Sequence, residues 1–181
     1  MKTTFRIFAA IAMIAGFTTT AMSQNTPVGT AAPTSAGAKI VKALSLTQTS
    51  PLHFGTMTIP TTAVEVALST ANVRTPSAAV LTLLAQSPVS TNAGYNVVGS
   101  NGATYAIQLP ADNVVTITEG STPMHVDSFI ALSTSTSSGT GGTLDASAGT
   151  DHFVVGATLK LASGQPFGVY TGTFNVTVAY N

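Results

Sequence analysis

Residues 168–181 carry the most regular pattern of apolar and polar positions in the chain. Apolar side chains and one glycine occupy every even position from Tyr170 to Tyr180, and the odd positions between them hold Thr, Asn and Ala. A period of two buries one face of a β-strand and leaves the other face in water. The pattern therefore predicts a long strand, built into a sheet, over this terminal segment.

The same alternation recurs in shorter runs, at Thr62–Ser69, Tyr105–Leu109 and Phe153–Leu161. Asn101-Gly102 between two such runs predicts a tight hairpin. Short strands at regular spacing, with no helical crossovers, predict an all-β chain folded as a single immunoglobulin-like antiparallel β-sandwich. Its expected core comprises Phe54, Val66, Tyr105, Ile107, Leu109, Phe153, Val155, Leu159, Phe174, Val176 and Val178.

The first residues have the layout of a secretory signal peptide. Basic residues precede a short apolar run at 8–17, and small residues lead up to an expected cut between Ser23 and Gln24. We expect residues 1–23 to be the signal peptide, 24–37 a flexible leader interrupted by prolines, and 38–181 the β-sandwich domain. No second long apolar run follows, so we expect no membrane span in the processed protein.

The composition limits which partners the protein can have and indicates what its stability depends on. The chain has no cysteine, and 7% of its residues are charged. A protein with so few basic residues is a poor candidate for nucleic-acid binding. Without disulfides, an exported domain of this kind depends on a packed core for its stability.

Few residues could carry out chemistry. His125 and Asp127 are two positions apart and would share one strand face, where a third ligand could complete a metal site. His53 and the pair Asp151-His152 are the other candidates. No nucleophile, paired carboxylates or phosphate loop accompanies them. We interpret these residues as polar positions on strands, and expect no catalytic residue, no metal and no cofactor.

Several motifs together resemble a known bacterial family. They lie at 52–55 (LHFG), 104–110 (TYAIQLP), 143–147 (TLDAS) and 153–159 (FVVGATL), and continue through the terminal segment. This set resembles the family called domain of unknown function 4402. The resemblance implies export from a Gram-negative bacterium, to the periplasm, the cell surface or the medium, and implies no settled activity.

The terminal segment has a second, narrower resemblance, to subunits of chaperone–usher pili. Those subunits have a Tyr in the penultimate position and a Gly fourteenth from the end, which Tyr180 and Gly168 match. The resemblance implies that the last strand borders a groove, which a chaperone or the next subunit fills by β-strand addition. The possible assembly strand comprises Gly168, Tyr170, Gly172, Phe174, Val176, Val178 and Tyr180.

Two functions remain open from the sequence. The first is a non-enzymatic, exported structural protein, such as a subunit of a pilus or fimbria, with copies of itself or a periplasmic chaperone as partners. The alternative is a secreted or surface binding module that holds a small ligand or carbohydrate in its loops. Residues 24–37 contain few bulky side chains, which would make the leader a poor donor strand.

Overall fold

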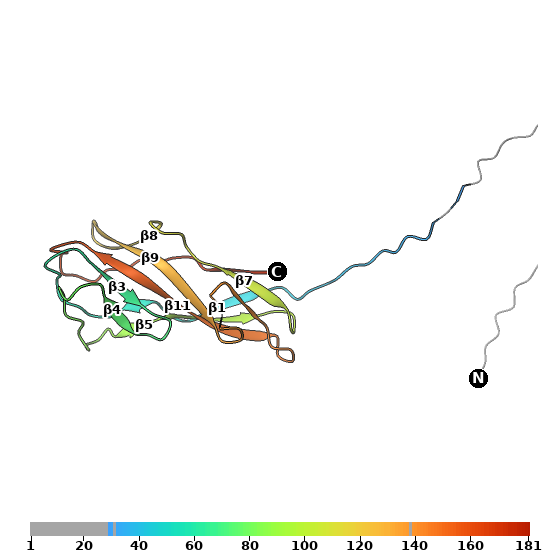
Figure 1. Ribbon diagram of the computed structural model, residues 1–181, viewed down its shortest axis with the longest axis horizontal. Helices are drawn as coiled ribbons and strands as arrows, with labels where there is room; N and C mark the ends of the chain where they lie inside the picture. The colour runs from blue at the N-terminus through green and yellow to red at the C-terminus, as the bar shows by residue number, and fades with distance from the viewer. Residues whose placement is uncertain (1–28, 31, 138) are drawn as a thin grey trace, which may run out of the picture. The chain divides into compact units, whose positions relative to one another are not determined.

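The computed structural model describes residues 29–30, 32–137 and 139–181, and every regular element among them is a β-strand (Figure 1). Residues 39–181 form one compact unit. The strands in chain order are β1 (Ser45–Ser50), β2 (His53–Phe54), β3 (Val64–Leu68), β4 (Arg74–Pro76), β5 (Ser90–Thr91), β6 (Ala93–Val98), β7 (Thr104–Gln108), β8 (Val115–Glu119), β9 (Thr122–Ser133), β10 (Gly141–Thr143), β11 (Thr150–Leu161) and β12 (Thr177–Tyr180).

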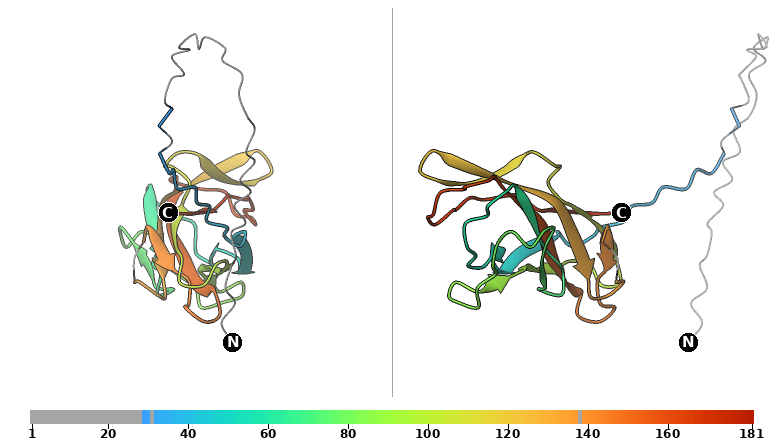
Figure 2. Two further views of the ribbon diagram at one scale, coloured as in Figure 1. Left: turned by 90° about the vertical axis from the view of Figure 1, so that its right-hand side faces the viewer. Right: turned by 60° about the vertical axis from the view of Figure 1, so that its left-hand side comes forward.

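The largest sheet is antiparallel and is built around β11, the long orange strand in Figure 2. One edge of β11 pairs with β9. The other edge pairs first with β6, over Thr150–Val155, and then with β3, over Ala157–Leu161. Gly156 lies at this change of partner, where an added Cβ would come within 2.2 Å of the Leu68 carbonyl oxygen. A residue without a side chain therefore lets β3 approach β11.

A second antiparallel sheet has the order β10-β7-β12, and β2 pairs with β5 separately. The hairpin expected across Asn101-Gly102 is wrong, because β6 and β7 belong to different sheets. Both edges of β6 are taken, by β1 and β11, so β7 has no edge to join. Gly102 still makes the turn, with a φ of 68°, and the turn carries the chain between sheets.

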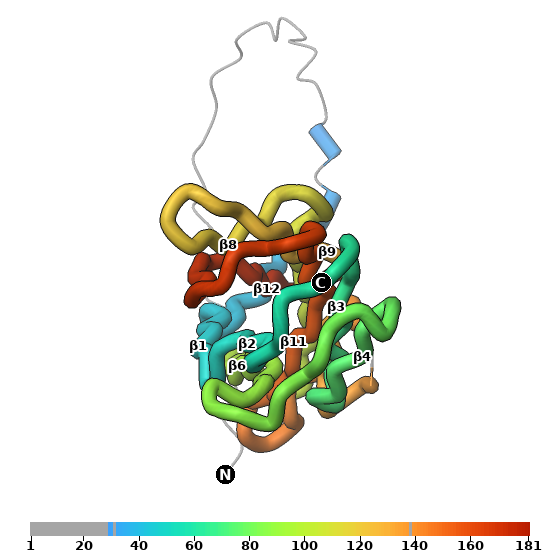
Figure 3. Tube along the Cα trace, turned by 90° about the vertical axis from the view of Figure 1, so that its left-hand side faces the viewer, coloured from blue at the N-terminus to red at the C-terminus, as the bar shows by residue number. Residues whose placement is uncertain are grey.

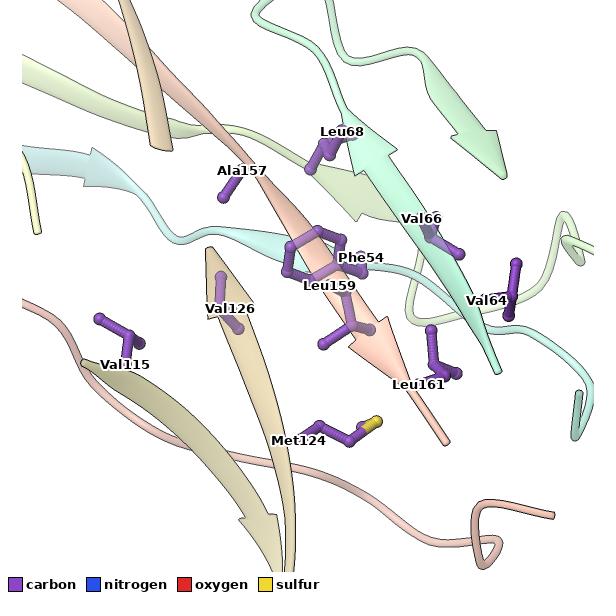
Figure 4. Packing of buried hydrophobic residues seen from close by; sticks show 10 residues of the cluster. All are labelled: Phe54, Val64, Val66, Leu68, Val115, Met124, Val126, Ala157, Leu159 and Leu161. Carbon is purple, nitrogen blue, oxygen red and sulfur yellow. The ribbon is translucent and has the colours of Figure 1, made fainter. Parts of the chain in front are cut away.

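Two apolar clusters form the core. One lies between the largest sheet and the three-stranded sheet, and brings Tyr95 and Phe153 of the first into contact with Tyr105 and Ile107 of the second. The other cluster gathers around Phe54, among side chains of β3, β8, β9 and β11 (Figure 4). Of the expected core, these residues are buried: Phe54, Val66, Tyr105, Ile107, Phe153, Val155 and Leu159.

The remaining four expected core residues, Leu109, Phe174, Val176 and Val178, are half-buried. Residues 79–85 form no strand, and Leu83 makes a single bridge to Met57. The Ser- and Gly-rich segment at 133–150 contains β10, and its Leu144 is buried.

The expected signal peptide and the beginning of the leader lie outside the described residues. Residues 29–30 and 32–43 are exposed and have no regular secondary structure. In the described part of the chain, no helix is long and apolar enough to cross a membrane.

Candidate functional site

A groove with a volume of about 570 Å³ runs along the second apolar cluster. One wall is the chain from Leu52 to Pro60, and the other is the chain from Gln165 to Phe174. Figure 3 shows the second wall in red, between the cyan chain around β2 and the yellow β8 and β9. The groove therefore separates two segments that are more than a hundred positions apart in the sequence.

The groove is apolar and carries no Asp, Glu, Lys or Arg among its lining residues. Its floor is formed by side chains from three strands of the largest sheet, and its rim exposes the large apolar residues Ile59, Phe167 and Val169. Exposed apolar surface of this kind marks sites where another molecule binds. The floor residues are Val115, Ile117, Met124, Val126, Leu159 and Leu161.

Polar groups at one end of the groove are bonded to each other. The buried Gln165 accepts a hydrogen bond from the Ala162 amide and donates one to the Tyr170 hydroxyl at 3.0 Å. That hydroxyl in turn donates to the Pro166 carbonyl at 2.9 Å. These polar atoms stabilise the turn that leads into the terminal segment, residues 168–181.

The terminal segment is less regular than its sequence pattern predicts. It forms a regular strand only at β12, which pairs with β7, and one further bridge joins Thr171 to Thr118 of β8. Gly172 packs so closely on β8 that an added Cβ would come within 2.6 Å of the Thr116 carbonyl oxygen. The chain thus passes from β8 of one sheet to β7 of the other, which prevents one continuous ladder.

The predicted alternation of burial is nevertheless present. Phe174, Val176, Val178 and Tyr180 are half-buried, and the odd residues from 173 to 181 are exposed. A strand that has neighbouring strands along both of its edges would bury such core-facing residues fully, as β3 buries Val66. The four side chains therefore face the core from a wall that is itself uncovered on one side.

The backbone of β12 leaves one edge open. Thr177 and Ala179 stand opposite Gln108 and Ala106, and the Asn181 amide donates to the Thr104 carbonyl, so odd residues direct their backbone groups toward β7. Successive residues of a strand face opposite edges, so Val178 directs its backbone groups away from β7. Among the described strands, β12 pairs with β7 alone.

Tyr180 connects the end of the terminal segment to the chain just before β1. Its hydroxyl donates to the Lys42 carbonyl at 2.6 Å and accepts from the Ser100 amide at 2.7 Å. The Lys42 amide donates to the Ser100 hydroxyl at 2.7 Å. These three residues, here called the Tyr180 clamp, fix where the leader joins the domain.

The two polar positions expected on one face of β9 do not share it. A bulge at Ser128, whose φ is 50°, shifts the register with β11, so Asp127 is buried directly after Val126 while His125 is exposed. The carboxylate of Asp127 lies 2.7 Å from the Lys160 ammonium and accepts from the Asn113 amide at 2.5 Å. Lys160 first, and then the Asn113 amide, hold the pKa of Asp127 below its usual range.

The other candidates also make local contacts. His53 accepts a hydrogen bond from the Gly55 amide through Nδ1, at 2.8 Å. His152, next to Asp151, lies half-buried on β11. Within the described residues, no three His, Asp or Glu side chains come together as metal ligands would.

Asp151 is the centre of a polar network that the sequence did not reveal. Its carboxylate accepts from the hydroxyls of Tyr105, Ser133 and Ser135, at 2.9, 2.8 and 2.6 Å. Burial alone would raise the pKa of Asp151, but the three hydroxyls outweigh it and lower that pKa. Tyr105 belongs to the three-stranded sheet, so this network joins the two sheets.

Comparison with known proteins places the chain in one family. No curated protein matches it, and no solved structure does. A family model with the description "Domain of unknown function (DUF4402)" matches residues 44–180, which include both walls of the groove and all twelve strands. The chain therefore belongs to the DUF4402 family.

Proposed function

We propose that this protein is a non-enzymatic, exported structural subunit that assembles by β-strand addition. In this proposal its two main sheets form an immunoglobulin-like sandwich that lacks one strand beside the terminal segment. The observation that carries the proposal is the apolar groove, one wall of which, the chain from Gln165 to Phe174, leads into β12, a strand that pairs with β7 alone among the described strands. The subunit would be used on the surface of a bacterium, as in a pilus or fimbria.

Strand addition needs two things from the receiving protein. Backbone donors and acceptors on an open edge supply affinity, and pockets for alternate side chains supply specificity. Val178 and its even neighbours supply the open backbone edge, and the apolar floor of the groove supplies the pockets. Because proteins normally blunt open edges, an edge left uncovered beside an apolar groove favours a partner strand.

A small ligand fits the groove less well. Sites for small molecules contain a few polar groups that are directed at the ligand and fix its orientation. In this groove Gln165 and the Tyr170 hydroxyl already bond to each other and to the backbone.

A charge placed in the groove tests the proposal. Ile59 lines the groove with 51% of its surface exposed, and Val73, outside it, is 57% exposed. We expect Ile59→Lys to abolish concentration-dependent assembly, because a buried ammonium would have no partner there. Val73→Lys is the matched control and should assemble as the unsubstituted chain does. Size-exclusion chromatography with light scattering measures assembly, and thermal unfolding confirms that both variants fold.

Two results would contradict the proposal. One is an unsubstituted chain that stays monomeric at every concentration and binds neither a chaperone nor any added strand. The other is equal assembly of the two lysine variants, which would place the contact outside the groove.

A further inference from the structure

We propose that Asn101 is a site of covalent modification, where loss of the side-chain amide produces aspartate or isoaspartate, and that the loop at 145–149 controls the rate. Asn101 is the only asparagine in the chain that precedes a glycine. With Gly102 it forms an exposed turn between β6 and β7, outside the lining of the groove. The chemistry of this turn therefore does not depend on the proposed function.

The reaction needs only the chain and water. The backbone nitrogen of Gly102 loses its proton and bonds to Cγ of Asn101, while the bond from Cγ to Nδ2 breaks and the amide leaves as ammonia. Water then opens the resulting succinimide ring at one of its two carbonyl carbons. Opening at Cγ gives aspartate. Opening at the main-chain carbonyl gives isoaspartate, in which the main chain runs through Cβ and Cγ.

Glycine at the next position leaves the attacking nitrogen uncrowded. Gly102 has a φ of 68°, and an added Cβ there would meet no atom within 4 Å. Asn113 is also exposed in a turn and has a φ of 63°, but the residue after it is the β-branched Val114. Asn101 is therefore the asparagine that the chain predisposes to this reaction, and Asn113 is its internal reference.

The loop at 145–149 engages both reacting groups in the folded domain. The Gly102 amide donates to the Asp145 carbonyl at 3.2 Å, and Nδ2 of Asn101 donates to the Ser147 carbonyl at 2.8 Å. The nitrogen that must attack and the amide that must leave are thus both held by one loop. The succinimide can form only when a local opening breaks these two bonds, so the rate follows the population of the open loop.

One carboxylate and one glycine keep this loop on the turn. The Asp145 carboxylate accepts hydrogen bonds from the Ser147 amide and hydroxyl, both at 2.8 Å, and from the Ala148 amide at 2.7 Å. Gly149 lies so close to the turn that an added Cβ would come within 2.6 Å of Oδ1 of Asn101. A change at either residue should therefore move the loop away from Asn101.

Modification would irreversibly break the contact between the loop and the turn. The new carboxylate has no hydrogen to donate to the Ser147 carbonyl, so two acceptors would face each other. Ser100, the residue before Asn101, belongs to the Tyr180 clamp. Asn101→Asp, which has one of the two products in place, should therefore speed hydrogen exchange of the Ser100 amide. Unchanged exchange there would show that the modification does not reach the clamp.

A pair of glycine substitutions tests the control by the loop. Gly149 and Gly164 have nearly the same φ, 65° and 64°, so alanine is equally strained at either position. The added Cβ would crowd Asn101 from position 149, whereas at position 164 it would meet no atom within 4 Å. We expect Gly149→Ala to speed the loss of the Asn101 amide about tenfold, and Gly164→Ala to leave it unchanged. Peptide mass spectrometry of the incubated chain, with enzymatic methylation of isoaspartate, measures the rate.

Substitution of the loop carboxylate tests the same control without straining the backbone. Asp145→Ala removes the bonds within the loop and leaves Asn101 and Gly102 in place. Asp112→Ala is the matched control, since it also removes an exposed carboxylate that accepts from a backbone amide, that of Ser128. Only Asp145→Ala should speed the loss of the Asn101 amide, and thermal unfolding confirms that both variants fold.

Hydrogen exchange tests the proposal in the unsubstituted chain. Low concentrations of denaturant should speed exchange of the Gly102 amide and loss of the Asn101 amide by the same factor, because one opening releases both. An Asn101 amide that persists as long as that of Asn113, even in the unfolded chain, would show that Asn101 is not a modification site. Equal rates in the folded and unfolded chain, or in the two glycine variants, would overturn control by the loop.

Discussion

Two neighbouring residues of the terminal segment lie in opposite environments. Val176 is half-buried against the cluster that joins the two main sheets, while Thr177 is exposed and stands opposite Gln108. Their backbones are equivalent parts of one extended chain. A change made at both positions therefore separates the effect of burial from the effect of strand propensity.

We expect Val176→Asp to reduce the free energy of unfolding by more than about 2 kcal/mol, because the new carboxylate would lose water without gaining a partner. Thr177→Asp should change it by less than about 1 kcal/mol, since its side chain stays in water. Urea unfolding followed by circular dichroism measures both. Equal destabilisation would show that the odd face of the segment is also covered.

At the scale of the element, the bulge in β9 explains why a buried carboxylate lies in an apolar strand. The bulge turns Asp127 inward next to Val126, toward Lys160 of β11 and the amide of Asn113. Lys160 is 42% exposed, so its ammonium keeps part of its hydration while it pairs with the carboxylate. The ion pair therefore fastens β9 and the turn before β8 to the central strand.

The ion pair predicts how stability depends on pH. The folded pKa of Asp127 lies below the value of about 3.9 that an unfolded chain would have. Its contribution is therefore fully present above about pH 4 and is lost as the pH falls through the folded pKa. Asp127→Asn should be less stable than the unsubstituted chain at pH 7, with the difference shrinking below pH 4. A difference that stays constant from pH 7 to pH 3 would exclude this linkage.

The sequence predicted individual strands better than their partners. Alternation marked β3, β7 and β11, because the burial of one strand face is a local property of the chain. The Asn101-Gly102 hairpin failed because pairing depends on which edges are free, and β1 and β11 take both edges of β6. Met124–Leu132 alternates imperfectly in the sequence, and the bulge at Ser128 is the cause.

The candidate site was predictable only in part. The terminal segment was recognisable, since its even residues repeat over ten positions and do face the core. Its opposite wall was not, because nothing in the chain from Leu52 to Pro60 indicates that it stands across a gap from Phe174. The open edge of β12 depends on the arrangement of all the strands, and no local pattern encodes it.

At the scale of the whole molecule, one hydrogen-bond network ties the two main sheets together. Tyr105 is fully buried in the three-stranded sheet and donates to Asp151 of β11. Burial, and then the neighbouring carboxylate, raise the pKa of the Tyr105 hydroxyl, so it remains a donor at any ordinary pH. The sheets are thus joined by a polar contact as well as by apolar packing.

Removing that hydroxyl should loosen the whole domain. We expect Tyr105→Phe to lower the free energy of unfolding by about 1–3 kcal/mol, since one hydrogen bond to a charged group is lost. Tyr170→Phe, which removes a hydroxyl bonded only within one turn, is the control and should cost less. Thermal unfolding monitored by circular dichroism compares them, and a larger effect at Tyr170 would contradict the importance of the inter-sheet contact.

The Tyr180 clamp decides which part of the domain a pull on the leader reaches first. Lys42 precedes β1 in the chain, and its carbonyl and amide bond to Tyr180 and Ser100. Tension applied to the leader would therefore load the end of β12 and the turn after β6 before it reached β1 or the core.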